Sequence, residues 1–333
     1  MEVPQLNNHA MLLMLAAGVL SLATLFVLFQ RHIDGQPLLA YQPRRRVPWG
    51  PLAALVAIYF VVDRFVPLLW NAETLDNNEI TPTEFIRDGW IGSIIMLGFV
   101  AAGMAWLAAT RDADAHDLGL PTSRRQLARD AGVGVVACLA ALLPIYLVQY
   151  VLFIALQPEQ QHPLIEQLLE NHTPAMILVG FVTAVVVAPV FEEFVFRLLF
   201  QGWLERYEDE RIGYQGSAAG AAAGGDAAAR LLVDEKNEGE LAGLSESEDR
   251  GEPLPPPARG MLPGLPHGWA PVLISGFAFG LAHFGNGVSP LPLFLFGMVL
   301  GYLYQRTHRL APSIVAHMLF NTYSLALLWA QIG

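Results

Sequence analysis

The sequence predicts an all-α protein, a polytopic transmembrane helix bundle with about eight spans. Hydrophobic residues make up 54% of its 333 residues and charged residues only 15%, whereas soluble domains carry about 25% charged residues. The apolar residues also fall in long uncharged blocks, several of which reach the roughly 20 residues that a membrane-spanning helix needs. The net charge of −11 argues against a nucleic-acid partner, and the single cysteine, Cys138, excludes a disulfide scaffold.

Eight apolar segments carry the expected helices, and we divide them between two regions. Residues 1–130 hold three spans, and residues 131–331 hold five spans that we expect to form the functional domain. The segments, in chain order, are 10–29, 47–70, 89–110, 131–156, 174–204, 268–285, 289–305 and 310–331. The fifth segment is uncharged up to residue 191 and then continues past two glutamates, which makes it the most unusual of the eight.

Arginine placement predicts the orientation of the bundle. The loops 31–46, 111–130 and 306–309 are rich in arginine, whereas the connections on the other side of the membrane hold only Arg87. By the positive-inside rule the arginine-rich loops are cytoplasmic. We therefore expect a multi-pass protein of the cell membrane, in contact with membrane lipid, with both termini outside.

Two connecting segments differ in composition from the spans. Residues 207–267 contain an Ala/Gly run and a proline cluster, and between residues 205 and 252 there are 13 acidic and 5 basic residues. Low hydrophobicity and like charge favour disorder, so we expect a low-complexity acidic insert on the cytoplasmic side. Residues 163–169 have an apolar face at helical spacing, which predicts a short helix in the outer membrane interface.

Ionisable residues inside a span are costly and indicate function. The sequence places Glu192, Glu193, Arg197, His283 and His317 in three of the expected helices. Glu193 and Arg197 stand four residues apart, acid first, which favours an ion pair along one helix face. Glu192 points about 100° away from Glu193 around the helix, and it therefore remains free for chemistry.

These residue types favour hydrolysis by an activated water. A buried carboxylate becomes an effective general base, and histidine or the amide of Asn321 can stabilise an oxyanion. One glutamate and two histidines also match the ligand count of a catalytic zinc site, so Glu192, His283 and His317 are candidate metal ligands. The HExxH spacing is absent, and the cofactor stays open between no metal and a divalent metal such as zinc.

Three motifs resemble one family. Glu192–Arg197 matches EExxxR, Phe279–His283 matches FxxxH, and His317–Asn321 matches HxxxN, in this order on successive membrane helices. Together they resemble the CPBP intramembrane proteases, also called the Abi or type II CAAX prenyl endopeptidase family. The resemblance covers about residues 130–331, whereas the first three helices carry no signature of the family.

The resemblance implies a role for each motif residue. Glu192 would activate the water with help from His283, and His317 and Asn321 would stabilise the oxyanion. Glu193 and Arg197 would give structural support. The substrate would be a protein or peptide, either prenylated or embedded in the membrane, and members near this pattern are called metalloproteases.

Two other classes of function remain open. Polar residues inside a bundle also mark transport pathways, but transporters usually contain internal repeats, and none is visible here. A non-catalytic membrane scaffold or immunity-type protein of the same family is the second alternative. Intact motifs favour the enzyme over the scaffold.

Overall fold

Each of the eight predicted apolar segments is helical in the computed structural model, which describes residues 7–42, 46–69, 81–156, 173–214, 258–285 and 287–332. The described residues contain no strand. All but the fifth are uninterrupted α-helices: α1 (Asn8–Ile33), α2 (Leu52–Leu69), α3 (Pro82–Arg111), α4 (Arg124–Leu156), α10 (Trp269–Leu281), α11 (Pro290–Thr307) and α12 (Leu310–Ile332). The expected all-α membrane protein is confirmed.

The fifth helix runs from Pro174 to Ile212 and changes its winding along the way. It consists of α6 (Pro174–Phe181), the π-helix η1 (Val182–Val187), α7 (Ala188–Glu192), the π-helix η2 (Glu193–Gln201) and α8 (Gly202–Ile212). With 39 residues it is one of five described helices long and apolar enough to cross a membrane, beside α1, α3, α4 and α12. Helices α2 and α10 have shorter apolar stretches. The chain is thus a multi-pass membrane protein.

Polar caps set the helix starts outside the apolar segments. Thr81 accepts a hydrogen bond from the backbone N–H of Glu84 at 3.3 Å, and Glu84 in turn accepts one from the backbone N–H of Thr81 at 3.0 Å. This capping box, with Pro82 in the first turn, starts α3 seven residues before the apolar segment that begins at residue 89. Thr173 caps the fifth helix in a similar way, through the backbone N–H of Met176 at 3.3 Å.

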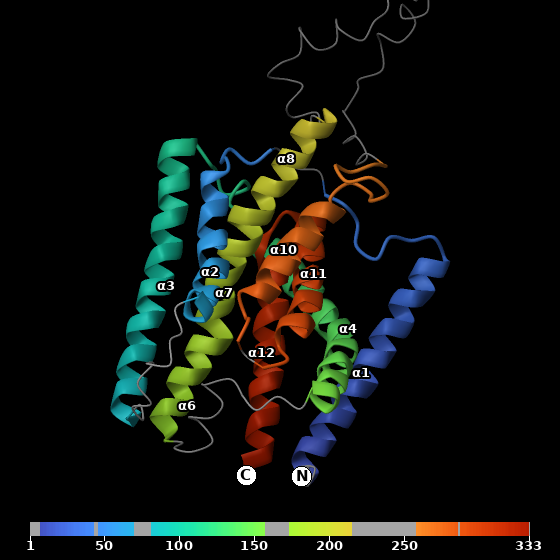
Figure 1. Cartoon of the computed structure of the whole chain (residues 1–333). Coiled ribbons are helices and arrows are strands. Elements are labelled where there is room, and N and C mark those ends of the chain that lie inside the picture. Colours follow the sequence, from blue (N-terminus) through green and yellow to red (C-terminus); the bar gives the residue numbers. More distant parts are fainter. Residues whose placement is uncertain are drawn as a thin grey trace, which may run out of the picture.

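The helices α10, α11 and α12 lie in the middle of the bundle, with α2 and α3 on one side and α4 and α1 on the other (Figure 1). The start of α1 and the end of α12 lie at the same end of the bundle (Figure 1). The opposite end carries α8 and the arginine-rich loops, which touch one another: the N–H of Gln42 donates to Arg306 O at 2.8 Å and that of Leu310 donates to Gly119 O at 3.0 Å.

The ends of the expected insert 207–267 belong to the folded part of the chain. Residues 207–212 continue α8, and the carboxylate of Glu208 accepts hydrogen bonds from the backbone N–H groups of Met261 at 2.9 Å and Gly268 at 2.6 Å. The ring Nε2 of His267 lies 2.7 Å from Asp209 Oδ1. These buried acidic groups fasten residues 258–268 to α8, while residues 215–257 and the segment 163–169 lie outside the described residues.

Paired glycines allow α10 and α11 to approach closely. Gly276 and Gly280 on α10 face α11, and Gly297 and Gly301 repeat the same four-residue spacing on α11. A Cβ atom on Gly276 would lie 3.0 Å from the backbone nitrogen of Met298, and one on Gly280 would lie 2.6 Å from Pro290 O. Small residues at such spacing let membrane helices pack backbone to backbone.

We expect Gly280→Ala to destabilise the bundle, because the added methyl group meets a backbone carbonyl that cannot turn aside. Overpacking of this kind costs about 1–3 kcal/mol, which thermal unfolding of the purified protein in detergent would detect. Gly98→Ala is the matched control, since a Cβ atom at this position on α3 meets nothing within 4 Å. Equal melting temperatures for the two variants would contradict the close approach of α10 and α11.

Candidate active site

The two adjacent glutamates of the fifth helix have different surroundings. The side chains of Glu193 and Arg197 are both 0% exposed, and Arg197 Nε donates to Glu193 Oε2 at 3.2 Å. The side chain of Glu192 keeps 21% of its surface exposed. The four-residue spacing thus forms the ion pair that it predicts, and it leaves the neighbouring carboxylate accessible.

His317 of α12 lies between these two carboxylates. Its Nδ1 is 3.0 Å from Glu193 Oε1, and its Nε2 is 3.7 Å from Glu192 Oε2. The ring is also held edge-on between Phe279 and Phe296, with centroid distances of 5.6 Å and 5.5 Å. Glu193 therefore orients the imidazole through one nitrogen and directs the other nitrogen toward Glu192.

Ser275 of α10 joins the same network, and the sequence did not single it out. Arg197 Nη1 donates to Ser275 Oγ at 2.7 Å, and Ser275 Oγ donates to Phe196 O at 2.9 Å. Ser275 is 0% exposed, and its hydroxyl gives one nitrogen of the buried guanidinium, Nη1, a partner that lowers the cost of burial. The only signal in the sequence is a serine in an otherwise apolar segment, four residues before Phe279.

Phe279, the first residue of the FxxxH motif, connects the pair to both histidines. It is 0% exposed, the Arg197 guanidinium carbon lies 5.3 Å from its ring centroid, and the His283 ring lies 4.9 Å away. A cation over an aromatic face is stabilised, most strongly where water is absent. The motif therefore supplies an aromatic support for the site as well as a histidine.

His283 lies two residues beyond the end of α10 and stands apart from the glutamates. Its Nδ1 lies 2.8 Å from the carbonyl oxygen of Phe279, and the residue is half-buried. Within the described ranges it makes no ion pair with Glu192 or Glu193. The structure thus brings together Glu192, Glu193, Arg197 and His317, and it leaves Nε2 of His283 available to a further group.

Asn321 reaches a carbonyl group that the winding of the fifth helix leaves without its usual partner. In a π-helix the carbonyl of residue i accepts from the N–H of residue i+5, and for Ala184 that residue is Pro189, which has no N–H. Asn321 Nδ2 donates to Ala184 O at 2.8 Å. Pro189 and Asn321 together therefore stabilise the winding that precedes Glu192.

The three candidate metal ligands have the donor atoms that zinc prefers, but the structure does not bring all three together. Glu192 and His317 meet, and each histidine places Nδ1 near an oxygen acceptor, the arrangement that orients a metal-binding Nε2. Glu192, His283 and His317 do not converge as a set. In the described part of the chain, a group of three His, Cys, Asp or Glu side chains with close ligand atoms lies elsewhere, in the loop after α3. It consists of Asp114, His116 and Asp117, whose ligand atoms all lie within 4.8 Å of one another.

Comparison with known families identifies the last helices of the chain. Residues 258–323 match the family model described as type II CAAX prenyl endopeptidase Rce1-like. The C-terminal helices are therefore similar to this family. The match confirms the resemblance to the CPBP family that the motifs predict, and its range contains Phe279, His283, His317 and Asn321 but not Glu192 or Glu193.

The glutamates outside the matched range are tied to the Rce1-like helices by contact, through His317 and Ser275. The comparisons with curated proteins and with solved structures found no match to the chain. The chain is therefore a multi-pass membrane protein with CAAX-protease-like C-terminal helices.

We expect Glu193→Ala to destabilise the protein strongly, because it leaves Arg197 buried and unpaired. Breaking a buried ion pair from one side costs about 3–5 kcal/mol. The double variant Glu193→Ala/Arg197→Ala removes both charges, so it should lose less stability than the two single losses added together. Strict additivity in thermal unfolding would show that the two residues are not energetic partners.

Proposed function

We propose that the protein is an intramembrane endopeptidase that hydrolyses a peptide bond with a water activated by Glu192. The observation that supports this most directly is the contrast between two neighbouring carboxylates. Glu193 is closed off by Arg197 and His317, while Glu192 keeps an exposed surface beside His317 Nε2. A free carboxylate next to an oriented imidazole is a suitable general base for water.

The proposed reaction uses each residue at a stated atom. Glu192 takes a proton from the water, the oxygen of which attacks the peptide carbonyl carbon. The protonated Glu192 then gives that proton to the leaving amine as the carbon–nitrogen bond breaks. A donor at the developing oxyanion lowers the barrier. The donors we assign are the amide hydrogen of Asn321 that Ala184 does not occupy and, when the imidazole carries a proton on both nitrogens, His317 Nε2.

His283 and the structural pair complete the proposed site. The Nε2 atom of His283 is available to the water, because its Nδ1 is already held at the Phe279 carbonyl. Glu193 and Arg197 act through the position of His317. Glu192 and His317 could hold a zinc ion between them, which would supply a more acidic water, whereas His283 stands apart from this pair.

The proposed substrate is a protein or peptide that reaches the site from the membrane. Lipid-soluble chains are favoured because the site stands on membrane helices and aromatic rings surround it. The family resemblance points to tails that carry a prenyl group, or to membrane-embedded segments, as the class to test first.

We also propose that the arginine-rich end of the bundle faces the cytoplasm. Loops from three parts of the chain meet at this end, and their shared arginine content follows the positive-inside rule. The start of α1 and the end of α12 lie together at the other end (Figure 1), so in this orientation both termini are outside.

Single cysteines test this orientation, because the native Cys138 is buried. We expect a membrane-impermeant maleimide to label Thr83→Cys on intact cells and Ala258→Cys only on inside-out vesicles. Both positions are exposed, and neither substitution alters the charge bias. The reverse labelling pattern would overturn the orientation.

The direct test of the function is Glu192→Gln. We expect it to keep the fold, since the amide is nearly isosteric, and to lose about 10²–10⁴-fold in turnover, since the amide cannot take a proton from water. The measurement is cleavage of a library of membrane and prenylated peptides in liposomes, with wild-type protein and Gly98→Ala as controls.

Wild-type turnover by Glu192→Gln would assign the base to another residue, whereas no cleavage by the wild-type protein itself would favour the scaffold or transporter. A chelator arm on the wild type then separates the two mechanisms. Inhibition that added Zn²⁺ reverses would support a metal at Glu192 and His317, and full activity in chelator would support the metal-free form.

A further inference from the structure

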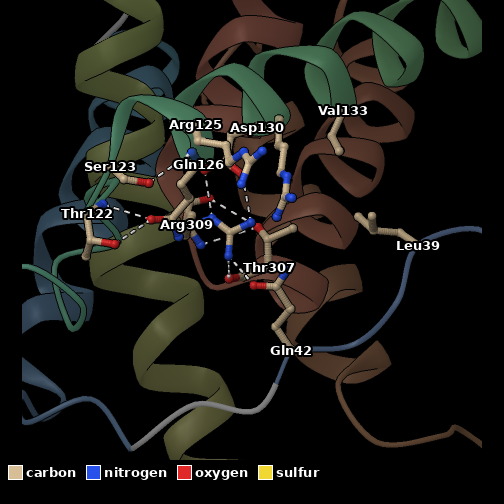
Figure 2. A pocket seen from close by; sticks show the side chains of 11 residues that line it. Leu39, Gln42, Thr122, Ser123, Arg125, Gln126, Asp130, Val133, Thr307 and Arg309 are labelled. Atoms are coloured by element: carbon tan, nitrogen blue, oxygen red, sulfur yellow. Dashed lines mark hydrogen bonds and ion pairs between the residues drawn. The ribbon is translucent and has the colours of Figure 1, made fainter.

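A second site lies at the arginine-rich end of the bundle, away from the candidate active site. A cavity of about 460 Å³ is bounded by the loop after α1, the first turns of α4 and the link between α11 and α12 (Figure 2). Leu39 and Gln42 line it from the loop, Arg125 and Arg129 from α4, and Thr307 and Arg309 from the link. None of the proposed catalytic residues takes part.

Arg309 is fixed in the wall of this cavity. Its Nε and Nη2 atoms donate to the two carboxylate oxygens of Asp130, both at 2.7 Å, and Asp130 is 0% exposed. Its Nη1 donates to the side chain of Gln42 and to the carbonyl oxygen of Thr307. The charge of Arg309 is thus balanced, and its hydrogen bonds tie the three segments together.

Arg125 and Arg129, unlike Arg309, have no partner in the described part of the chain that balances their charge. They stand one helical turn apart on α4, both are exposed, and both line the cavity. Among the residues that the structure describes, neither has an ion pair or a hydrogen bond from its side chain. The nearby carboxylate of Asp130 is already taken by Arg309, so two positive charges remain unbalanced at the opening.

The position of these arginines along α4 matches the lipid headgroups. The uncharged stretch of α4 begins at Ala131, so Arg129 and Arg125 lie about 3 Å and 9 Å beyond it along the helix axis. The headgroup layer is roughly 5–7 Å thick on each side of the hydrocarbon core. Arg129 therefore lies within that layer. Arg125 stands just beyond its outer edge, and its long side chain can reach back to a phosphate in the layer.

The cavity has an apolar side and a polar side, as a lipid with a polar headgroup and an apolar tail requires. Leu39 and Val133 lie at one side of it, and Thr122 and Ser123 lie at the other (Figure 2). Ser123 Oγ accepts a hydrogen bond from the backbone N–H of Gln126 at 3.1 Å, which leaves its hydroxyl hydrogen free to donate. A phosphate can thus reach cationic and hydroxyl donors while the attached glycerol and first acyl carbons contact apolar side chains.

We propose that this cavity binds the phosphate headgroup of an anionic glycerophospholipid from the leaflet at the arginine-rich face. Arg125 and Arg129 supply the guanidinium forks that match a phosphate, and Ser123 supplies a neutral donor. Basic pockets between membrane helices are suited to such headgroups. A lipid that binds this cavity binds the folded bundle and not the unfolded chain, so it stabilises the folded bundle.

The test uses the full chain, purified in a neutral detergent. We expect dioleoyl phosphatidylglycerol to raise the melting temperature, and we expect neither dioleoyl phosphatidylcholine nor sodium phosphate at matched ionic strength to do so. In Arg125→Gln/Arg129→Gln the half-saturating mole fraction of phosphatidylglycerol should rise about 30-fold, at about fivefold for each arginine. The matched control is Arg111→Gln/Arg124→Gln, which removes two exposed arginines of the same face that do not line the cavity.

Retention of the lipid effect by the control and its loss in Arg125→Gln/Arg129→Gln would support the site. Equal loss in both double variants would overturn it in favour of general surface charge. A stabilisation by sodium phosphate as large as that by phosphatidylglycerol would assign the cavity to a soluble anion, and a wild-type protein that does not respond to phosphatidylglycerol would refute the proposal.

Discussion

The buried ion pair between Glu193 and Arg197 is the constraint on which the rest of the site depends. A charged pair without exposed surface is costly unless further hydrogen bonds stabilise it, and two of these contacts come from other helices. Ser275 of α10 accepts from Arg197, and His317 of α12 contacts Glu193. Satisfying the pair therefore fixes where α10 and α12 stand against the fifth helix, and it brings His317 to Glu192.

The winding of the fifth helix is the second part of this arrangement. Pro189 removes one backbone donor, the carbonyl of Ala184 turns to Asn321 instead, and α12 is held at this level of the bundle. The π-helical turns on both sides of α7 widen the helix beside the two glutamates, and such turns are frequent at functional sites. One proline in the sequence thus affects both the course of the backbone and the packing of α12.

Hydropathy and motif spacing predicted the eight helices and the Glu193–Arg197 pair, because both depend on local periodicity. The start of α3 was predicted seven residues late, since a Thr–Glu capping box is polar. The ends of the insert were set too wide, because Glu208 and Asp209 look solvated in the sequence but bind the backbone and His267. The pair Asp130–Arg309 joins residues 179 positions apart, and no local pattern predicts such a contact.

The central claim is that two adjacent carboxylates have different roles: Glu192 acts as the general base, and Glu193 stabilises the fold. The measurement that tests it most directly is turnover per folded molecule for Glu192→Gln and Glu193→Gln, each with its melting temperature. We predict that Glu192→Gln melts like the wild type but turns over about 10²–10⁴-fold more slowly, whereas Glu193→Gln melts at a lower temperature and retains more activity per folded molecule. The opposite result, an active Glu192→Gln beside a stable and inactive Glu193→Gln, would contradict the account.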